Sequence, residues 1–213
     1  MIRNFIFDFD GTLADTSQLI VATMQKSIVE CKLPFRSEEE IKATIGVRLE
    51  EIPSILWHDK TGIGEWFANV YRKNFERIKE EIKVSLFPNV QETLSVLKER
   101  EYGLVIATSR SKRSVIELAE ILGIKGYFDF LLGGDNVSEG KPNPESIYII
   151  LEKMKWNPSE TMMTGDMPVD ILMGKNAGIE TCGVTYGNSK ETDLKEAGTD
   201  YIIKDFSEIL NII

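Results

Sequence analysis

Two pairs of aspartates follow short apolar runs, and their type and spacing point to metal or acid–base chemistry. Asp8 and Asp10 close the first apolar run of the chain, and Asp166 and Asp170 follow a later run at 161–164. Alternate side chains on extended backbone point the same way, so Asp8 and Asp10 project together. Two carboxylates at such a short separation repel each other unless a cation or a shared proton lies between them. The pattern therefore predicts an oxygen-rich site suited to Mg²⁺.

Each aspartate pair also has a purely structural explanation. A turn at Asp10 and Gly11 could simply end the strand, and an aspartate shortly before Pro168 often does no more than cap a helix. Neither explanation accounts for Asp8, which lies between two phenylalanines, because an isolated buried carboxylate costs several kcal/mol or shifts its pKa. Asp8 therefore favours the functional interpretation.

Three further residues could serve an anionic substrate. Thr108 and Ser109 end the apolar run at 103–107 and offer hydroxyl donors, although taken alone they are better explained by ordinary capping of the next helix. Lys141 lies in a loop stiffened by Pro142 and Pro144. A lysine in a loop is usually only solvated, but an acidic protein that handles an anion needs local positive charge from a metal, a lysine or backbone N–H groups.

Strand-length and helix-length segments alternate along most of the chain and would position these residues. The expected strands are at 2–7, 103–107, 130–132, 161–164, 181–184 and 201–203, and the expected helices between them are at 90–100, 112–122, 144–154, 169–177 and 193–197. This alternation predicts an α/β fold with a Rossmann-like parallel sheet. The carboxyl ends of parallel strands share one edge, so the acids should converge there.

The segment 15–83 departs from this alternation, because it contains no convincing strand. Apolar residues recur at helical spacing in it, and Ser37 with Glu40 predicts the start of one helix. A span of this length is too long for a loop. We therefore expect about four helices inserted after the first strand, as a helical cap domain at 15–83 on an α/β core domain at 1–14 and 84–213.

Composition excludes several classes of protein. The 213 residues carry 25 Lys plus Arg against 34 Asp plus Glu, a formal charge of −9, with no basic patch typical of nucleic-acid binding. No apolar run reaches the roughly 18 residues of a membrane span. The acidic start does not resemble a signal peptide, so we expect a cytoplasmic protein. A single histidine, His58, and two distant cysteines exclude a Ser-His-Asp triad and give no zinc-binding spacing.

Taken together, these segments resemble the four motifs of the haloacid dehalogenase superfamily in order and spacing, over essentially the whole chain. The matching segments are Asp8-Phe9-Asp10-Gly11-Thr12-Leu13, Thr108, Lys141 and Gly165-Asp166-Met167-Pro168-Val169-Asp170. The helical insertion resembles the C1 cap of the phosphoglycolate-phosphatase-like branch. The resemblance implies an α/β core with a helical cap and a phosphoryl-transfer active site.

The resemblance also implies catalytic roles. Asp8 would be the nucleophile that forms an aspartyl-phosphate, and Asp10 would protonate the leaving oxygen and then activate water. Thr108 and Lys141 would bind the phosphoryl oxygens. The reaction itself requires such groups. Attack of a carboxylate on a phosphate brings two anions together, and a cation is needed to offset their repulsion.

Metal and substrate contacts follow from the same resemblance. Mg²⁺ would be held by the Asp8 carboxylate, the Asp10 backbone carbonyl and Asp166, with Asp170 supporting from nearby. The residues expected to contact substrate are Gly11, Thr12, Ser109 and Arg48.

Arg48 belongs to a cap segment that resembles the one carrying substrate contacts. Gly46 could break a helix so that Arg48 faces the cleft; the alternative is an ion pair of Arg48 with Glu50 or Glu51. The junctions near Thr16 and Val84 are the expected hinges of the cap.

These features predict a Mg²⁺-dependent phosphatase acting on a small phosphorylated metabolite, such as phosphoglycolate, pyrophosphate, a nucleotide or a sugar phosphate. Asp10 and Asp166 argue against a dehalogenase. A mutase similar to beta-phosphoglucomutase is the main alternative, although such mutases often carry Val or Ile where this chain has Thr12. A non-catalytic phosphate-binding module is the other. We expect no nucleic-acid or membrane partner, and a monomer or homodimer.

Overall fold

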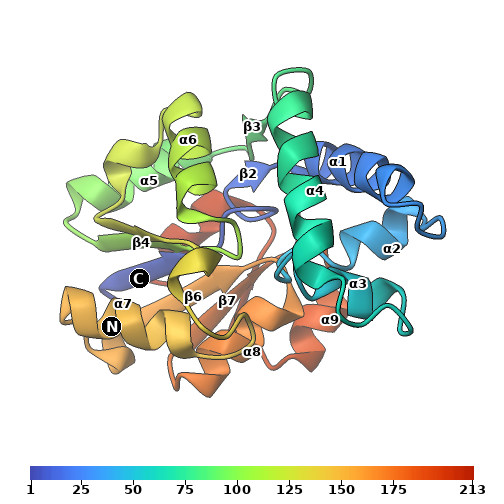
Figure 1. Cartoon of the computed structure of the whole chain (residues 1–213). Coiled ribbons are helices and arrows are strands. Elements are labelled where there is room, and N and C mark those ends of the chain that lie inside the picture. Colours follow the sequence, from blue (N-terminus) through green and yellow to red (C-terminus); the bar gives the residue numbers. More distant parts are fainter.

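A six-stranded parallel sheet forms the centre of the molecule in a computed structural model that describes all 213 residues (Figure 1). The strand order is β5-β4-β1-β6-β7-β8. The strands are β1 (Asn4–Phe7), β4 (Gly103–Ala107), β5 (Phe130–Leu132), β6 (Thr161–Gly165), β7 (Glu180–Val184) and β8 (Tyr201–Ile203). All pairings are parallel, which confirms the α/β fold predicted from the sequence.

Helices cover both faces of the sheet, as a parallel sheet requires. Phe5 and Phe7 pack on the face covered by α5 (Val90–Glu99), α6 (Lys112–Ile121) and the 3-10 helix η4 (Phe206–Asn211). Ile6, pointing the other way, packs with residues of α7 (Glu145–Met154) and α8 (Pro168–Asn176). The short helix α9 (Glu191–Glu196) and the 3-10 turns η1 (Lys125–Tyr127), η2 (Gly134–Asn136) and η3 (Pro158–Glu160) complete this part.

The expected helical insertion follows the first strand and lies beside the sheet (Figure 1). It consists of α1 (Ser17–Glu30), α2 (Glu38–Lys42), α3 (Ile52–Leu56) and α4 (Gly64–Ile78). The helices α1 and α4 pack along each other and bury apolar side chains such as Met24 and Phe67. Ser37 and Glu40 form the predicted capping box at the start of α2.

A two-stranded antiparallel ribbon joins the insertion to the sheet and was not predicted. It pairs β2 (Ala14–Asp15) with β3 (Ser85–Leu86). Two-residue strands are too short to produce a recognisable alternation in the sequence. The ribbon lies at the two junctions where we expected hinges, so both connections to the insertion are tied together at one place.

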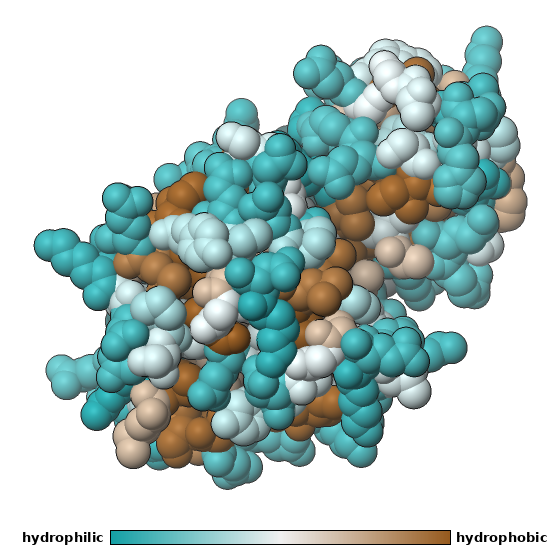
Figure 2. Space-filling model, turned by 90° about the horizontal axis from the view of Figure 1, so that it is seen from below, coloured by the Kyte–Doolittle hydropathy of each residue, from teal (hydrophilic) through white to brown (hydrophobic).

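The surface seen in Figure 2 is largely hydrophilic, with apolar patches between two lobes of unequal size and on the larger lobe. His58 is exposed, and Cys31 and Cys182 are buried free thiols. None of the helices combines the length and the apolar character needed to cross a bilayer.

Candidate active site

The first and fourth motifs meet where β1 and β6 lie side by side. The chain leaves β1 toward β4 and leaves β6 toward β7, so the connections diverge in opposite directions and open a crevice at the carboxyl edge. Asp8 follows β1 directly, and its amide continues the ladder by donating to the Thr164 carbonyl at 2.9 Å. Asp166 follows β6. Both aspartates are buried, with exposed fractions of 1% and 0%.

Lys141 bridges two of the carboxylates. Its Nζ lies 2.5 Å from Asp8 Oδ1 and 2.7 Å from Asp170 Oδ1. Burial alone would lower the pKa of Lys141, but the charges of Asp170 and Asp8 outweigh it and raise that pKa, which keeps the ammonium charged. The other oxygen of Asp8, Oδ2, is buried and has no hydrogen-bond partner. A buried carboxylate oxygen without a partner marks a place where a cation or a reacting atom fits.

Burial also governs the ionisation of the aspartates. It raises the pKa of Asp8 well above its ordinary value, and although Lys141 opposes the rise, the neighbouring Asp170 and Asp166 add to it. Burial, followed by the charge of Asp170, raises the pKa of Asp166 to about 7. A cation among these groups would favour their charged forms.

Asp166 is held by residues from two other segments. The Thr12 hydroxyl donates to its Oδ1 at 3.0 Å, and the Asn188 backbone N–H and side-chain amide donate to its Oδ2 at 2.8 Å each. Gly11 has a φ of +89°, and a Cβ there would lie 2.2 Å from Asp166 Oδ2. Thr12 therefore positions Asp166 and Gly11 leaves room for its Oδ2, while the expected substrate contacts of both residues stay predictions.

The residues present fit a divalent cation. Oxygens of Asp8, Asp166 and Asp170 lie within 4.8 Å of one another, and all three residues are buried. Together with Asp10, four carboxylates surround the two cations of Lys141 and Arg110, which leaves two negative charges uncompensated when all are ionised. An all-oxygen donor set with this charge suits Mg²⁺.

The Asp10 carboxylate lies outside this cluster, in contact with Arg110. Arg110 Nη2 is 2.6 Å from Asp10 Oδ1 and Nε is 3.0 Å from Oδ2, while the Thr16 hydroxyl donates to Oδ1 at 2.6 Å. The expected metal contact of Asp10 runs through its backbone carbonyl and stays a prediction.

Sequence reasoning missed Arg110, Thr16 and Asn188. A signal for Arg110 was available, since it opens the basic run Arg110-Ser111-Lys112-Arg113 immediately after the predicted phosphate-binding hydroxyls in an otherwise acidic chain. No comparable signal marks Thr16 or Asn188, because a single short polar residue in a loop is ordinary.

Thr108 and Ser109 follow β4 but point to different partners. The Thr108 amide extends the ladder to the Leu132 carbonyl at 3.1 Å, and its side chain lines the cavity described below. The Ser109 hydroxyl donates instead to the Gly46 carbonyl of the insertion at 2.6 Å. Ser109 therefore joins the two parts of the molecule, and only Thr108 of the two has a hydroxyl not used to bridge them.

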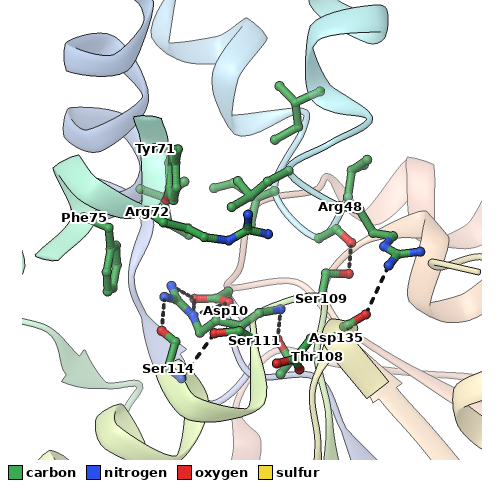
Figure 3. Close-up of a pocket in the computed structure, with 18 of the residues that line it drawn as sticks. Asp10, Arg48, Tyr71, Arg72, Phe75, Thr108, Ser109, Ser111, Ser114 and Asp135 are labelled. Atoms are coloured by element: carbon green, nitrogen blue, oxygen red, sulfur yellow. Dashed lines mark hydrogen bonds and ion pairs between the residues drawn. The ribbon is translucent and has the colours of Figure 1, made fainter. Parts of the chain in front are cut away.

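A cavity of about 470 Å³ separates the sheet edge from the insertion. Its sheet side carries Asp8, Asp10 and Thr108, and α4 supplies Tyr71, Arg72 and Phe75 from the other side. Figure 3 shows Asp10, Ser114 and Thr108 facing these α4 residues across the opening. The cavity is large enough for a small metabolite.

Arg48 lines the same cavity and ties the insertion to the core. Its guanidinium donates to the Ser138 carbonyl at 2.6 Å and to the Gly134 and Val137 carbonyls at 3.3 and 3.4 Å. It forms no ion pair with Glu50 or Glu51; Glu50 pairs with Arg72 at 2.5 Å. Gly46, two residues before Arg48, has a φ of +88° but breaks no helix, because α2 already ends at Lys42 and Gly46 lies in the turns that follow.

The chain is similar to known hydrolases over most of its length. The family model for haloacid dehalogenase-like hydrolases matches residues 5–184. The chain is 31% identical to pyrophosphatase PpaX from Oceanobacillus iheyensis over 100% of this chain and 97% of that protein. It is 30% identical to phosphoglycolate phosphatase from Haemophilus influenzae over 97% and 96% of the two chains.

The same fold is found in solved structures. A haloacid dehalogenase-like family hydrolase from Streptococcus pneumoniae matches with a TM-score of 0.87 and 26% identity, covering 99% of this chain and 98% of the other. These matches confirm the expected hydrolase of this superfamily, similar to the phosphoglycolate phosphatases and carrying a helical cap. The chain belongs to the family of haloacid dehalogenase-like hydrolases.

Proposed function

We propose that this protein is a Mg²⁺-dependent phosphatase that hydrolyses a small phosphate monoester through a phosphorylated Asp8. The observation that carries the proposal is the state of the Asp8 carboxylate. It lies at the cavity, one oxygen is held by Lys141 at 2.5 Å, and the other has no partner. Phosphatase and pyrophosphatase names among full-length relatives support the same reaction class.

The first step would transfer the phosphoryl group to Asp8. The unpartnered Oδ2 would attack phosphorus, a new bond would form between Asp8 and phosphorus, and the bond to the leaving oxygen would break. Asp10 would give a proton to that oxygen. Thr108 and Lys141 would hold the phosphoryl oxygens, and Lys141 also keeps the Asp8 carboxylate oriented for attack.

The second step would release inorganic phosphate. Asp10 would take a proton from a water molecule, that water would attack phosphorus, and the bond to Asp8 would break. Thr16 and Arg110 fix the orientation of the Asp10 carboxylate for both proton transfers.

Asp8, Asp166 and Asp170 would hold the Mg²⁺ ion, with the Asp10 carbonyl as a further ligand. When bound, the ion supplies positive charge that offsets repulsion between the carboxylates and the phosphoryl group. Thr12 and Asn188 already hold Asp166, so one ligand is positioned by the fold itself.

The cap would exclude water from the reaction and select the leaving group. Arg48 and Ser109 connect it to the core in the structure, and the cavity lies between the two parts. Expelling water strengthens the electrostatic contacts at the phosphoryl group and limits side reactions. We propose that residues 15–83 act as this cap and residues 1–14 and 84–213 as the core.

A panel of phosphate esters assayed for phosphate release with Mg²⁺ and with EDTA tests the proposal. We expect release from at least one small monoester or from pyrophosphate, and no release in EDTA or with Asp8→Asn. A mutase would interconvert sugar phosphates instead and would need a bisphosphate activator. Release by pure Asp8→Asn protein would refute the role of Asp8.

A further inference from the structure

The guanidinium of Arg110 is held at the cavity with donor capacity to spare. One edge of the guanidinium donates to the Asp10 carboxylate through Nε and Nη2, and Nη1 donates to the Ser114 hydroxyl at 3.1 Å. A guanidinium has five N–H groups. Two of them, one on each terminal nitrogen, have no partner in the protein.

The surroundings of Arg110 are suited to recognition of an anion. Its side chain is 9% exposed, and its Cζ lies 5.0 Å from the centre of the Phe75 ring on α4. Contact with the ring and with Asp10 limits the motion of the guanidinium. A planar fork that is already oriented loses little entropy when it binds a carboxylate or a phosphate.

Arg110 also lies on one defined side of the expected reaction centre. Asp10, which would protonate the leaving oxygen, contacts Arg110 directly at 2.6 Å, whereas Lys141 contacts Asp8 and Asp170 beneath the phosphoryl position. With Asp10 as the proton donor, the free N–H groups of Arg110 would therefore be near the leaving group rather than near the transferred phosphoryl group.

The other arginines of the cavity are less suited to this task. Arg48 also has N–H groups to spare, but its three contacts are to backbone carbonyls and not to an acid of the expected reaction centre, and Arg72 is exposed and pairs with Glu50. Arg113 lines the cavity but is exposed and has no ion-pair partner to orient it. Arg110 alone among them is nearly enclosed, fixed on an aspartate and left with free donors.

We propose that Arg110 determines leaving-group specificity by binding a second anionic group, a carboxylate or a phosphate, on the leaving side of the substrate. The inference rests on the proposed phosphatase function. It predicts that esters with an anionic leaving group are preferred over neutral esters of the same size.

The test compares phosphoglycolate with ethyl phosphate, which has a methyl group in place of the carboxylate. The readout is the ratio of the two kcat/KM values in the wild type, Arg110→Met and Arg113→Met. A charged hydrogen-bonded contact corresponds to a factor of about 10–100, so Arg110→Met should lower the ratio by that amount. Arg113→Met removes the same formal charge from the same cavity and should change the ratio by less than about threefold.

Two results would overturn the inference: an unchanged ratio in Arg110→Met, or an equal fall in Arg113→Met, which would indicate the general field of the cavity. Should Arg110→Met not fold, Arg110→Lys keeps the charge but loses the planar fork, and it should lower the ratio by a smaller factor than the methionine variant is expected to. An unchanged ratio in a folded Arg110→Lys would count against the inference.

A binding measurement separates this inference from the proposed function. Calorimetry with Mg²⁺ would compare 3-phosphonopropionate with propylphosphonate, neither of which can be hydrolysed. We expect the carboxylate to strengthen binding in the wild type and not in Arg110→Met. If the wild type released no phosphate from any ester, the proposed function would fail, while this comparison would still decide the role of Arg110.

Discussion

Replacing Lys141 by methionine should destabilise the protein far more than removing an ordinary salt bridge. The substitution keeps most of the apolar stem and removes the ammonium that contacts Asp8 at 2.5 Å and Asp170 at 2.7 Å. At an effective dielectric constant of about 20, each contact is worth about 6 kcal/mol before desolvation. Burying an ammonium costs several kcal/mol in return, so we expect a net loss of about 3–5 kcal/mol in the free energy of unfolding.

Lys175→Met is the matched control. Lys175 contacts Asp200 at the same 2.5 Å, but both side chains are 35% exposed, against 3% and 2% for Lys141 and Asp8. An exposed pair contributes about 0–1 kcal/mol. Urea unfolding of the wild type and both variants at pH 8 in EDTA measures the difference. Equal losses in the two variants would refute the reasoning that burial, rather than contact distance, sets the strength of the pair.

The pH dependence of the Lys141→Met variant provides a second check. Lys141 lowers the pKa of Asp8, so its removal should raise that pKa further. A carboxyl group with a raised pKa in the folded state binds a proton that the unfolded chain does not, and stability then rises as pH falls. The gap between wild type and variant should therefore narrow between pH 8 and pH 5.5. A gap that widened over this range would contradict the assignment.

Three further outcomes are expected. Gly11→Ala should abolish activity, because the added Cβ would lie 2.2 Å from Asp166 Oδ2. The control Gly62→Ala has a similar φ of +86° and no atom within 4 Å, so it should cost only backbone strain and keep activity. Similar activity in the two variants would contradict this prediction. Arg48→Ala should raise KM for neutral and anionic esters alike, since its guanidinium joins cap and core; a selective rise in KM would instead show a direct substrate contact. With the pKa of Asp166 at about 7 and that of Asp8 raised as well, Mg²⁺ affinity measured by calorimetry should increase from pH 5.5 through pH 7 and level off only where both carboxyls are ionised, with proton release at the lower pH. An affinity independent of pH would refute this.

The position of the acids could be predicted because parallel strands share an edge. Asp8 and Asp166 each follow an apolar run, and this local pattern was enough to place both at the carboxyl end of a strand. Lys141 is different, since it is 133 residues from Asp8 in the chain and its loop carries no local signal of the contact. The stiff loop and the need for local positive charge made Lys141 a candidate, but only the resemblance to a known family gave it a specific role.

Side-chain pairing across the fold is what the sequence could not supply. Arg110 and Asp10 are 100 residues apart, and nothing in either segment specifies that they meet. Ser109 was expected to contact substrate; it lines the cavity, and its hydroxyl donates to the Gly46 carbonyl, a bond that the local sequence does not specify. A short hydroxyl side chain satisfies whichever acceptor the fold brings near, so its direction depends on how the insertion packs rather than on the local sequence.

The covalent intermediate on Asp8 is the central claim, and mass spectrometry tests it most directly. The wild type and Asp10→Asn would be mixed with Mg²⁺ and p-nitrophenyl phosphate, whose leaving group departs without a proton from Asp10, so that only activation of water is blocked in the variant. Both would then be quenched in acid and digested. We predict one added phosphoryl group on the peptide that contains Asp8, more abundant in Asp10→Asn than in the wild type. Turnover in the wild type with no phosphoryl group on that peptide in either protein, or with phosphorylation at another residue, would contradict the account.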